Sequence, residues 1–359
     1  MSLDRALGWF TIAAGARELN ENLPMVGTPI TNFFDEAQNE FIRTGHKVAG
    51  NILYKREITQ NVTSGYTRAR EDIIDPYQHF EMPWRQSQAV YNEDGNTIED
   101  NLGGVTIQEL MRNSNMMARV PQGDRNTLVN ILAPRFRNLN TSYREKKETD
   151  FLKKSVDEEG NEGPDGIDVI TNPNTSYGGL GYTECGVATW KSDLLGVNPY
   201  LWNPLTKDKG AVSITKDDYR AAARDIQKQY SNLTTIDNSK PWTYFWVSPN
   251  RYDNGVLKEW YTERRRTTPE DTEMGPTREF QDSVLRIRFK SVPMIENDNI
   301  VYFFAQGAIL RAMQRRRTPA QSLMVEKAYG QNLVKFTMRQ KYQYRSDARW
   351  QTGWIKGPI

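Results

Sequence analysis

Cysteine and histidine are scarce in this chain of 359 residues. The one cysteine, Cys185, cannot form a disulfide within the chain, and the two histidines, His46 and His79, lie far apart in the sequence. Histidine-based proton transfer and a Cys/His zinc site therefore lack the residues they need. The phosphate-binding P-loop, the zinc-protease helix and the Gly-x-Ser-x-Gly elbow are missing too. We predict that the chain is not an enzyme and binds no cofactor or metal.

Long apolar runs are missing as well. The stretch from Ile300 to Leu310 is interrupted by Gln306, and it is shorter than the roughly 20 residues that a membrane helix requires. A short apolar run at 6–16 follows Arg5, but Trp9 and other unsuited residues make it a poor signal sequence. We predict no membrane association.

The chain has almost no net charge and little apolar material. Its 47 Lys and Arg against 45 Asp and Glu give +2, far from the basic excess of a dedicated DNA-binding domain. Only 37% of the residues are hydrophobic, and the mean hydropathy is −0.73. This is thin for two self-sufficient globules, so we expect extended segments that become ordered by packing on other copies.

The first half of the chain mixes extended and helical patterns. Residues 1–35 resemble an extended arm ending in a short helix near 33–42, and 45–95 resembles a long two-stranded excursion that turns around Ser64-Gly65. Thr106 and Glu109 form a capping-box pattern before a helix to about 118, and Asp124 starts another helix to about 133.

A charged stretch follows between residues 146 and 168. Calcium binding is one interpretation of its carboxylates, but their spacing does not match the EF-hand pattern, and a solvated loop is favoured. The stretch is also the predicted boundary between a helical first half and a mixed second half. The carboxylates are Asp157, Glu158, Glu159, Glu162, Asp165 and Asp168.

The second half carries clearer local signals. Thr215 and Asp218 predict a helix start, 242–247 predicts a strand, and Ser248-Pro249 predicts the start of another helix. Alternation predicts a half-buried strand at 285–289, a buried strand at 300–304 and a further strand around 334–338. The glycines of Gly178-Gly179 predict a tight surface turn rather than a dinucleotide site.

Two functions from other classes compete with an assembly role. A carbohydrate-active hydrolase could line a cleft with aromatic residues beside paired carboxylates, although such aromatics are more often core or interface anchors. Nucleic-acid binding could use the basic triplets 264–266 and 315–317, although charges at helix ends and ion pairs explain these more simply. The residues of the hydrolase hypothesis are Trp242, Trp246, Trp260 and Tyr261 with Glu259 or Glu263.

The order of elements resembles one known family. The segment 286–298 is similar to that family's recurring pattern of a strand, a proline-containing turn, an acidic residue and a second strand, which here is the apolar run 300–304. Its sequence is Arg286-Ile-Arg-Phe-Lys-Ser-Val-Pro-Met-Ile-Glu-Asn-Asp298. Two further similarities are 172–179, Asn-Pro-Asn-Thr-Ser-Tyr-Gly-Gly, and Ser248-Pro249 after an apolar strand. The family is the major capsid proteins of tailed double-stranded DNA phages, whose fold is shared with herpesviruses.

The resemblance implies an α+β fold with named parts. They are an N-terminal arm (1–44), an extended β-hairpin loop (45–95), a peripheral domain with a long spine helix (96–165) and its return strands (275–312), and an axial domain with a mixed sheet flanked by helices (166–274 and 313–359). The candidate contacts between subunits are Tyr66, Arg68, Arg70 and Trp84, because Arg, Trp and Tyr give a large contact area in few residues.

The resemblance also implies partners and a location. The chain would assemble as hexamers and pentamers in a virion capsid, built in the host cytoplasm, with separate scaffolding, portal and decoration proteins. It would contact packaged DNA weakly and non-specifically. Lys55 and Asn332 are of the types that cross-link in some relatives, but nothing in the sequence places them together.

Overall fold

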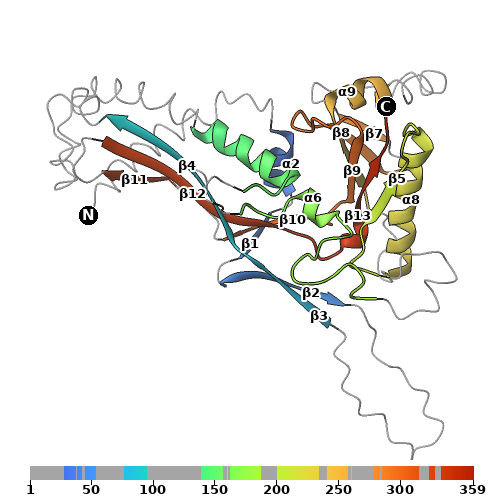
Figure 1. Ribbon diagram of the computed structural model, residues 1–359, viewed down its shortest axis with the longest axis horizontal. Coiled ribbons are helices and arrows are strands. Elements are labelled where there is room, and N and C mark those ends of the chain that lie inside the picture. The colour runs from blue at the N-terminus through green and yellow to red at the C-terminus, as the bar shows by residue number, and fades with distance from the viewer. Residues whose placement is uncertain are drawn as a thin grey trace, which may run out of the picture.

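Two β-sheets organise this chain, and a two-stranded ribbon extends from them (Figure 1). The computed structural model describes residues 28–37, 39–42, 45–53, 77–94, 139–156, 160, 162–186, 200–233, 241–257, 260, 279–282, 285–314, 323–327 and 333–359. Within this part, no helix is long and apolar enough to cross a membrane.

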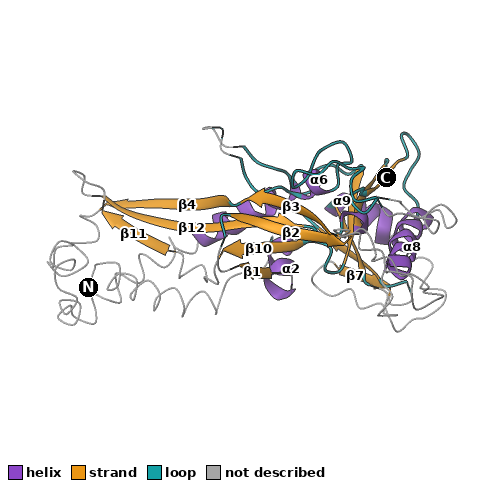
Figure 2. Cartoon of the chain, turned by 90° about the horizontal axis from the view of Figure 1, so that it is seen from below, coloured by secondary structure: helices purple, strands orange, loops and turns teal. Residues whose placement is uncertain are grey.

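The first sheet, which we call the long sheet, has five strands. They are β1 (Asn39–Ile42), β10 (Leu310–Gln314), β12 (Leu333–Arg345), β11 (Leu323–Lys327) and β4 (Arg85–Asp94). β12 is the central strand of this sheet. β10 and β11 pair with one edge of β12, and β4 runs antiparallel along its other edge, from Leu333↔Asp94 to Tyr342↔Arg85. Figure 2 shows β4, β11 and β12 extending away from the rest of the protein.

The second sheet, the mixed sheet, has six strands in the order β5-β13-β9-β6-β8-β7. Two of its strand pairs are parallel (β5 with β13, β6 with β8), and the other three are antiparallel. The strands are β5 (Leu205–Asp208), β13 (Thr352–Lys356), β9 (Ile300–Ala305), β6 (Thr243–Val247), β8 (Ile287–Ser291) and β7 (Glu279–Asp282).

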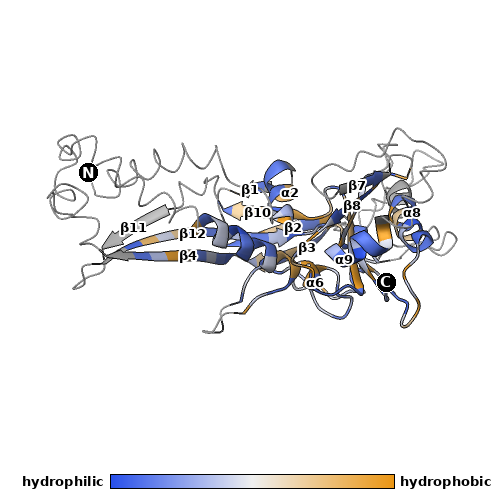
Figure 3. Cartoon of the chain, turned by 90° about the horizontal axis from the view of Figure 1, so that it is seen from above, coloured by the Kyte–Doolittle hydropathy of each residue, from blue (hydrophilic) through white to orange (hydrophobic). Residues whose placement is uncertain are grey.

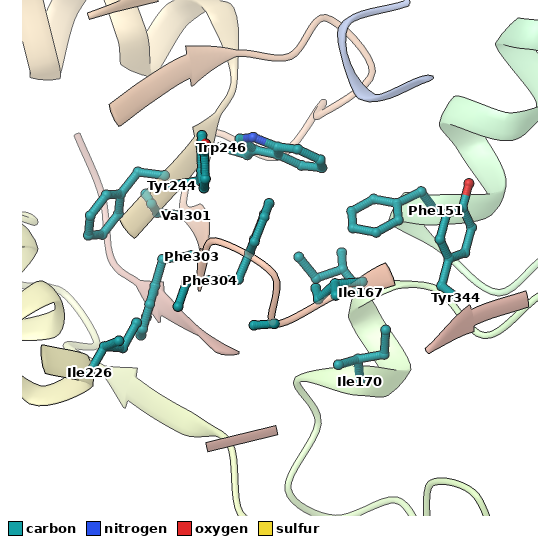
Figure 4. Close-up of a cluster of buried hydrophobic side chains, with 14 of the residues drawn as sticks. Phe151, Ile167, Ile170, Ile226, Tyr244, Trp246, Val301, Phe303, Phe304 and Tyr344 are labelled. Atoms are coloured by element: carbon teal, nitrogen blue, oxygen red, sulfur yellow. The ribbon is translucent and has the colours of Figure 1, made fainter. Parts of the chain in front are cut away.

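Aromatic side chains fill both faces of the mixed sheet. On one face, Tyr219 of helix α8 (Lys216–Leu233) meets the rings of Phe245 and Phe289 edge-on. On the other, Trp246 packs against Phe151 of a helix at 139–152, at a centroid distance of 5.1 Å. Figure 4 shows this core running from α8 through the sheet to Phe151. The remaining helices are α2 (Pro29–Ala37), α6 (Ile167–Ile170), α9 (Pro249–Arg251), the π-helix η2 (Tyr252–Leu257) and the 3-10 helix η4 (Arg349–Gln351).

The predicted start of α8 is confirmed at atomic detail. The Asp218 carboxylate accepts the Thr215 amide at 2.9 Å and the Thr215 hydroxyl at 2.9 Å. It also pairs with Lys207 at 2.7 Å and with Lys209. Burial alone would raise the pKa of Asp218, but hydrogen bonds from the two lysines and Thr215 outweigh it and hold that pKa well below its usual range.

Asp218→Asn should therefore destabilise the fold in a pH-dependent way. The lowered pKa means that this carboxylate stabilises the folded state above the unfolded pKa of about 4, and that the stabilisation is lost as pH falls towards the lowered native pKa. At pH 7 we expect the free energy of unfolding, measured in urea, to fall by about 2 kcal/mol. The difference in unfolding free energy between wild type and variant should narrow below pH 4. Asp217→Asn is the matched control, because the Asp217 side chain is 89% exposed.

Several other local predictions are confirmed. The Ser248 hydroxyl caps α9 by accepting the Arg251 amide at 3.2 Å, with Pro249 in the first turn. β6, β8, β9 and β12 lie where alternation or apolar runs predicted them. Gly178 and Gly179 have φ of +61° and +83° and form the predicted tight turn, closed by hydrogen bonds in both directions between Tyr177 and Leu180.

Residues 39–42 form β1, parallel to β10, rather than the predicted end of a helix, because long-range pairing decided the outcome. The strands at 287–305 pair with β6 and β13 in the mixed sheet, and β12 belongs to the long sheet. The division into peripheral and axial domains stays a prediction.

The charged stretch that begins at Lys146 is not a solvated loop at its start. Residues 139–152 are helical, and Lys147, Glu148 and Asp150 are buried. Asp150 accepts the Tyr342 hydroxyl at 2.7 Å and the Ser155 hydroxyl at 2.7 Å. Partners from other elements thus make a buried polar face possible.

Candidate assembly surface

The ribbon consists of β2 (Lys47–Leu53) and β3 (Tyr77–Pro83), paired antiparallel from Lys47↔Pro83 to Leu53↔Tyr77. This confirms the predicted two-stranded excursion at its base. The chain then enters β4, so 85–94 joins the long sheet although the predicted hairpin loop ran to 95. Residues 54–76 lie outside the described part, and with them the candidate contacts Tyr66, Arg68 and Arg70.

Phe80 fixes the ribbon to the body. Its ring is 1% exposed and packs against Trp202 and Tyr177, at centroid distances of 5.0 and 6.2 Å. Two glycines make room for it, since a Cβ on Gly50 would overlap the ring and one on Gly178 would lie 2.7 Å from it. The Glu81 amide donates a 3.2 Å hydrogen bond to the Gly178 carbonyl at the same place, so these residues form the joint between the ribbon and the body. The ribbon therefore leaves the body in a fixed direction.

Trp84, the fourth candidate contact, lies between the ribbon and β4. Its indole N–H donates to the Gly45 carbonyl at 3.1 Å, and its half-buried ring packs against the core. Trp84 therefore already makes contacts within its own chain, next to the ribbon. A role between subunits stays a prediction for the part of the ring that is exposed.

The outer face of the ribbon is polar and accessible. Lys47 pairs with Glu81 at 2.5 Å, and His79 shares a 2.5 Å hydrogen bond with Asn51. Tyr77, at the far end of the described ribbon, is 47% exposed. This face offers a cation, a carboxylate and an aromatic ring to a neighbour.

The long sheet offers a second broad surface. Along β4 and β12, hydrophilic residues are interspersed with fewer hydrophobic ones (Figure 3), and the residues on the two faces of the sheet differ. One face holds the stacked rings of Tyr91 and Phe336, 6.0 Å apart. The other carries Val90, which is 41% exposed, and exposed Lys341. An accessible, flat, extended strand pair of this kind suits contact with another protein surface.

The described residues of the predicted arm, 28–37 and 39–42, pack on this chain's own body. Ile30 and Phe34 of α2 are fully buried, and β1 pairs with β10 inside the long sheet. The arm of 1–44 stays a prediction, since residues 1–27 lie outside the described part.

The structure gives no support to the rival sites. Trp246 and Trp260 are buried, as the core interpretation predicted, while Glu259, Tyr261 and Glu263 lie outside the described residues, as do both basic triplets. Among the residues described, no group of carboxylate, histidine or cysteine side chains could hold a metal ion. Burial raises the pKa of the Cys185 thiol to about 11, so this cysteine is a poor nucleophile.

Sequence reasoning missed the residues that position the ribbon. Phe80 looked like any apolar strand residue, and Gly50 and Gly178 like ordinary strand and turn glycines. Only the alternation of buried Val48, Gly50 and Ile52 with exposed neighbours could have indicated that one face of the ribbon is packed.

Comparisons with known proteins find the fold through structure alone. No family model matches the chain, and no curated protein matches it. The capsid asymmetric unit of cyanophage A-1(L) superposes with a TM-score of 0.53 at 14% identity, covering 94% of each chain. The structure from Mycobacterium phage Adephagia superposes with a TM-score of 0.47 at 9% sequence identity, covering 96% of this chain and 94% of the other. The capsid of the native GTA particle superposes with a TM-score of 0.45 at 10% sequence identity, covering 95% of this chain and 94% of the other. The fold assignment rests on the cyanophage structure: this chain has the α+β fold of a tailed-phage capsid protein.

Proposed function

We propose that this chain is a major capsid subunit that self-assembles into the icosahedral head enclosing double-stranded DNA. The observation that carries the proposal is the match to the cyanophage capsid subunit over 94% of both chains. The match includes two sheets and an extended ribbon, not a compact globule with a cleft. The chain acts structurally, through contacts between copies, and is not an enzyme.

The surface features fit such a role. A ribbon held in a fixed direction can reach a neighbour, and the long sheet presents a broad face beside it. Copies related by rotation would make heterologous contacts and close into hexamers and pentamers. Tyr66, Arg68, Arg70 and the exposed part of Trp84 are the proposed contacts, with scaffolding, portal and decoration proteins as further partners. The particle would assemble in the host cytoplasm and make weak, non-specific contacts with DNA.

Electron microscopy of the purified chain tests the proposal directly. Uniform hollow particles are the expected result. A discrete monomer or dimer under all assembly conditions would contradict it, and salt-sensitive DNA binding by a small oligomer would favour the nucleic-acid alternative.

Shortening the ribbon should abolish these particles without unfolding the chain. Leu53 and Tyr77 are register partners, so residues 54–76 can be replaced by an Asn-Gly turn that keeps β2, β3 and the Phe80 joint intact. We expect a soluble, folded protein by circular dichroism that forms no particles in the microscope. A matched control keeps residues 54–76 and carries only Asp217→Asn, an exposed side chain of α8 outside the proposed assembly surface. Normal particles from the shortened chain would show that residues 54–76 are dispensable.

A further inference from the structure

Helix α2 docks on helix 139–152 through an apolar side and a polar side. The apolar side is Phe34, fully buried, whose ring lies 5.1 Å from that of Phe151 and 5.3 Å from that of Tyr344. On the polar side, Arg144 donates to the Thr28 hydroxyl at 3.3 Å and to Asn32. The docking thus joins the first described segment of the chain to the centre of the body.

Glu148 is the unusual member of the polar side. It is fully buried, and its Oε1 accepts the Thr31 amide in the first turn of α2 at 2.6 Å, across 117 residues of sequence. Its Oε2 is equally buried, yet receives no hydrogen bond from the residues that the structure describes. An ionised carboxylate with one unsolvated oxygen is costly in such a place.

The cations nearby are engaged elsewhere. Fully buried Arg311 of β10 pairs with Asp35 of α2, and Arg144 lies 3.8 Å from the same carboxylate. Among the described residues, no ion pair joins Glu148 to a cation. The charged and titratable groups around it are Arg144, Lys147 and Asp150 of its own helix, Asp35 of α2, Arg311 of β10 and Tyr344 of β12.

The energetics favour a proton on Glu148. Burial raises its pKa to about 7, against the opposing effects of the donors at Thr31 and Ile30 and of the Arg144 charge. A protonated carboxyl still accepts the Thr31 amide through its carbonyl oxygen, so the hydrogen bond does not require the charge.

We propose that Glu148 is a proton-binding latch: its protonated form holds α2 on helix 139–152, and loss of the proton weakens that docking. The latch is local to this chain and does not depend on the proposed function. Because α2 follows residues 1–27, it makes the attachment of the N-terminal segment sensitive to pH.

The direction of the effect follows from linkage. If undocking of α2 returns Glu148 to water, its pKa falls to the ordinary value of 4.5, whereas burial raises this pKa to about 7 when α2 is docked. Docking is strongest below pH 4.5 and weakens about tenfold per pH unit up to about 7, for a total of about 300-fold.

Hydrogen exchange with mass spectrometry tests this on the full chain, with exchange times scaled for the intrinsic pH dependence. In wild type, the protection of the α2 amides should fall about 300-fold between pH 4.5 and 7.5, while peptides from α8 keep theirs. Glu148→Gln, a neutral isostere, should hold α2 equally well at both pH values. The same pH dependence in Glu148→Gln as in wild type would overturn the proposal.

Lys147→Met provides the matched control. Lys147 is the adjacent buried titratable residue, but its ammonium lies over the rings of Tyr143 and Tyr342, at 4.7 and 5.8 Å, towards β12 rather than α2. This variant should keep the pH dependence below pH 7. If Glu148→Gln does not fold, infrared titration of wild type decides: a protonated carboxyl band that disappears near pH 7 supports the latch, and its absence at pH 5.5 overturns it.

Discussion

Replacing Phe80 by alanine should prevent particle formation while the two sheets stay folded. The ring fills a site between Gly50, Gly178, Tyr177 and Trp202, and truncating a buried phenylalanine costs about 3–5 kcal/mol. That loss falls on the joint between the ribbon and the body, so the ribbon should lose its fixed direction. Sedimentation and electron microscopy measure assembly, and near-ultraviolet circular dichroism reports on packing around the tryptophans.

The control for this variant is Tyr77→Ala. Tyr77 lies on the same strand but is 47% exposed, so its removal leaves the joint unchanged. If assembly needs a fixed ribbon, Phe80→Ala fails to assemble while Tyr77→Ala keeps a well-docked ribbon. Normal shells from Phe80→Ala would show that the direction of the ribbon does not matter. Gly178→Ala should reproduce the defect, because its φ of +61° and the nearby ring both oppose a side chain.

Arg349→Met should produce a large loss of stability. The fully buried guanidinium donates to the carbonyls of Ile170 and Asn172, each at 2.8 Å, and lies over the rings of Tyr177 and Trp202. Burial lowers its pKa only to about 10, so it is charged at neutral pH. Methionine fills similar space but leaves the Ile170 carbonyl without the Arg349 donor, while the Asn172 carbonyl keeps Thr175 as a donor, and we expect the free energy of unfolding to fall by about 3 kcal/mol.

Urea unfolding at pH 7 measures this change. Arg349→Lys should fall between wild type and Arg349→Met, because an ammonium keeps the charge but cannot stack as a plane and reach both carbonyls. Arg224→Met on the exposed face of α8 is the control and should alter the unfolding free energy by less than about 0.5 kcal/mol. Equal stability of wild type and Arg349→Met would mean that water satisfies those carbonyls.

Local chemistry was predictable from the sequence where a few neighbouring residues decide it. The Thr215 and Asp218 pair set the start of α8, and Ser248-Pro249 set the start of α9. Alternation of apolar and polar residues along 334–338 indicated β12, although Phe336, Thr337 and Met338 are all buried in the fold. In each case the deciding residues lie three positions apart or within a single strand.

The rest could not be predicted because distant partners determine it. Helix 139–152 was missed because its buried face carries Lys147, Glu148 and Asp150, which hydropathy marks as solvated. Thr31 and Tyr342, more than 100 residues away, each donate a hydrogen bond to one of the two carboxylates. The sheets to which β8, β9 and β12 belong could not be predicted for the same reason, since strand pairing assigns them and not their own residues.

The passage from β12 to β13 has a mechanical consequence. The chain crosses from the long sheet to the mixed sheet in six residues, 346–351, and Ser346, Arg349 and Trp350 among them are buried. A side-chain ion pair at 2.5 Å between Arg345 and Asp347 stiffens the entry to this passage. A force on the far end of the long sheet is therefore transmitted to the mixed sheet through a packed corner and not absorbed by a slack linker. Under such a force the long sheet and the mixed sheet should move together as one rigid body.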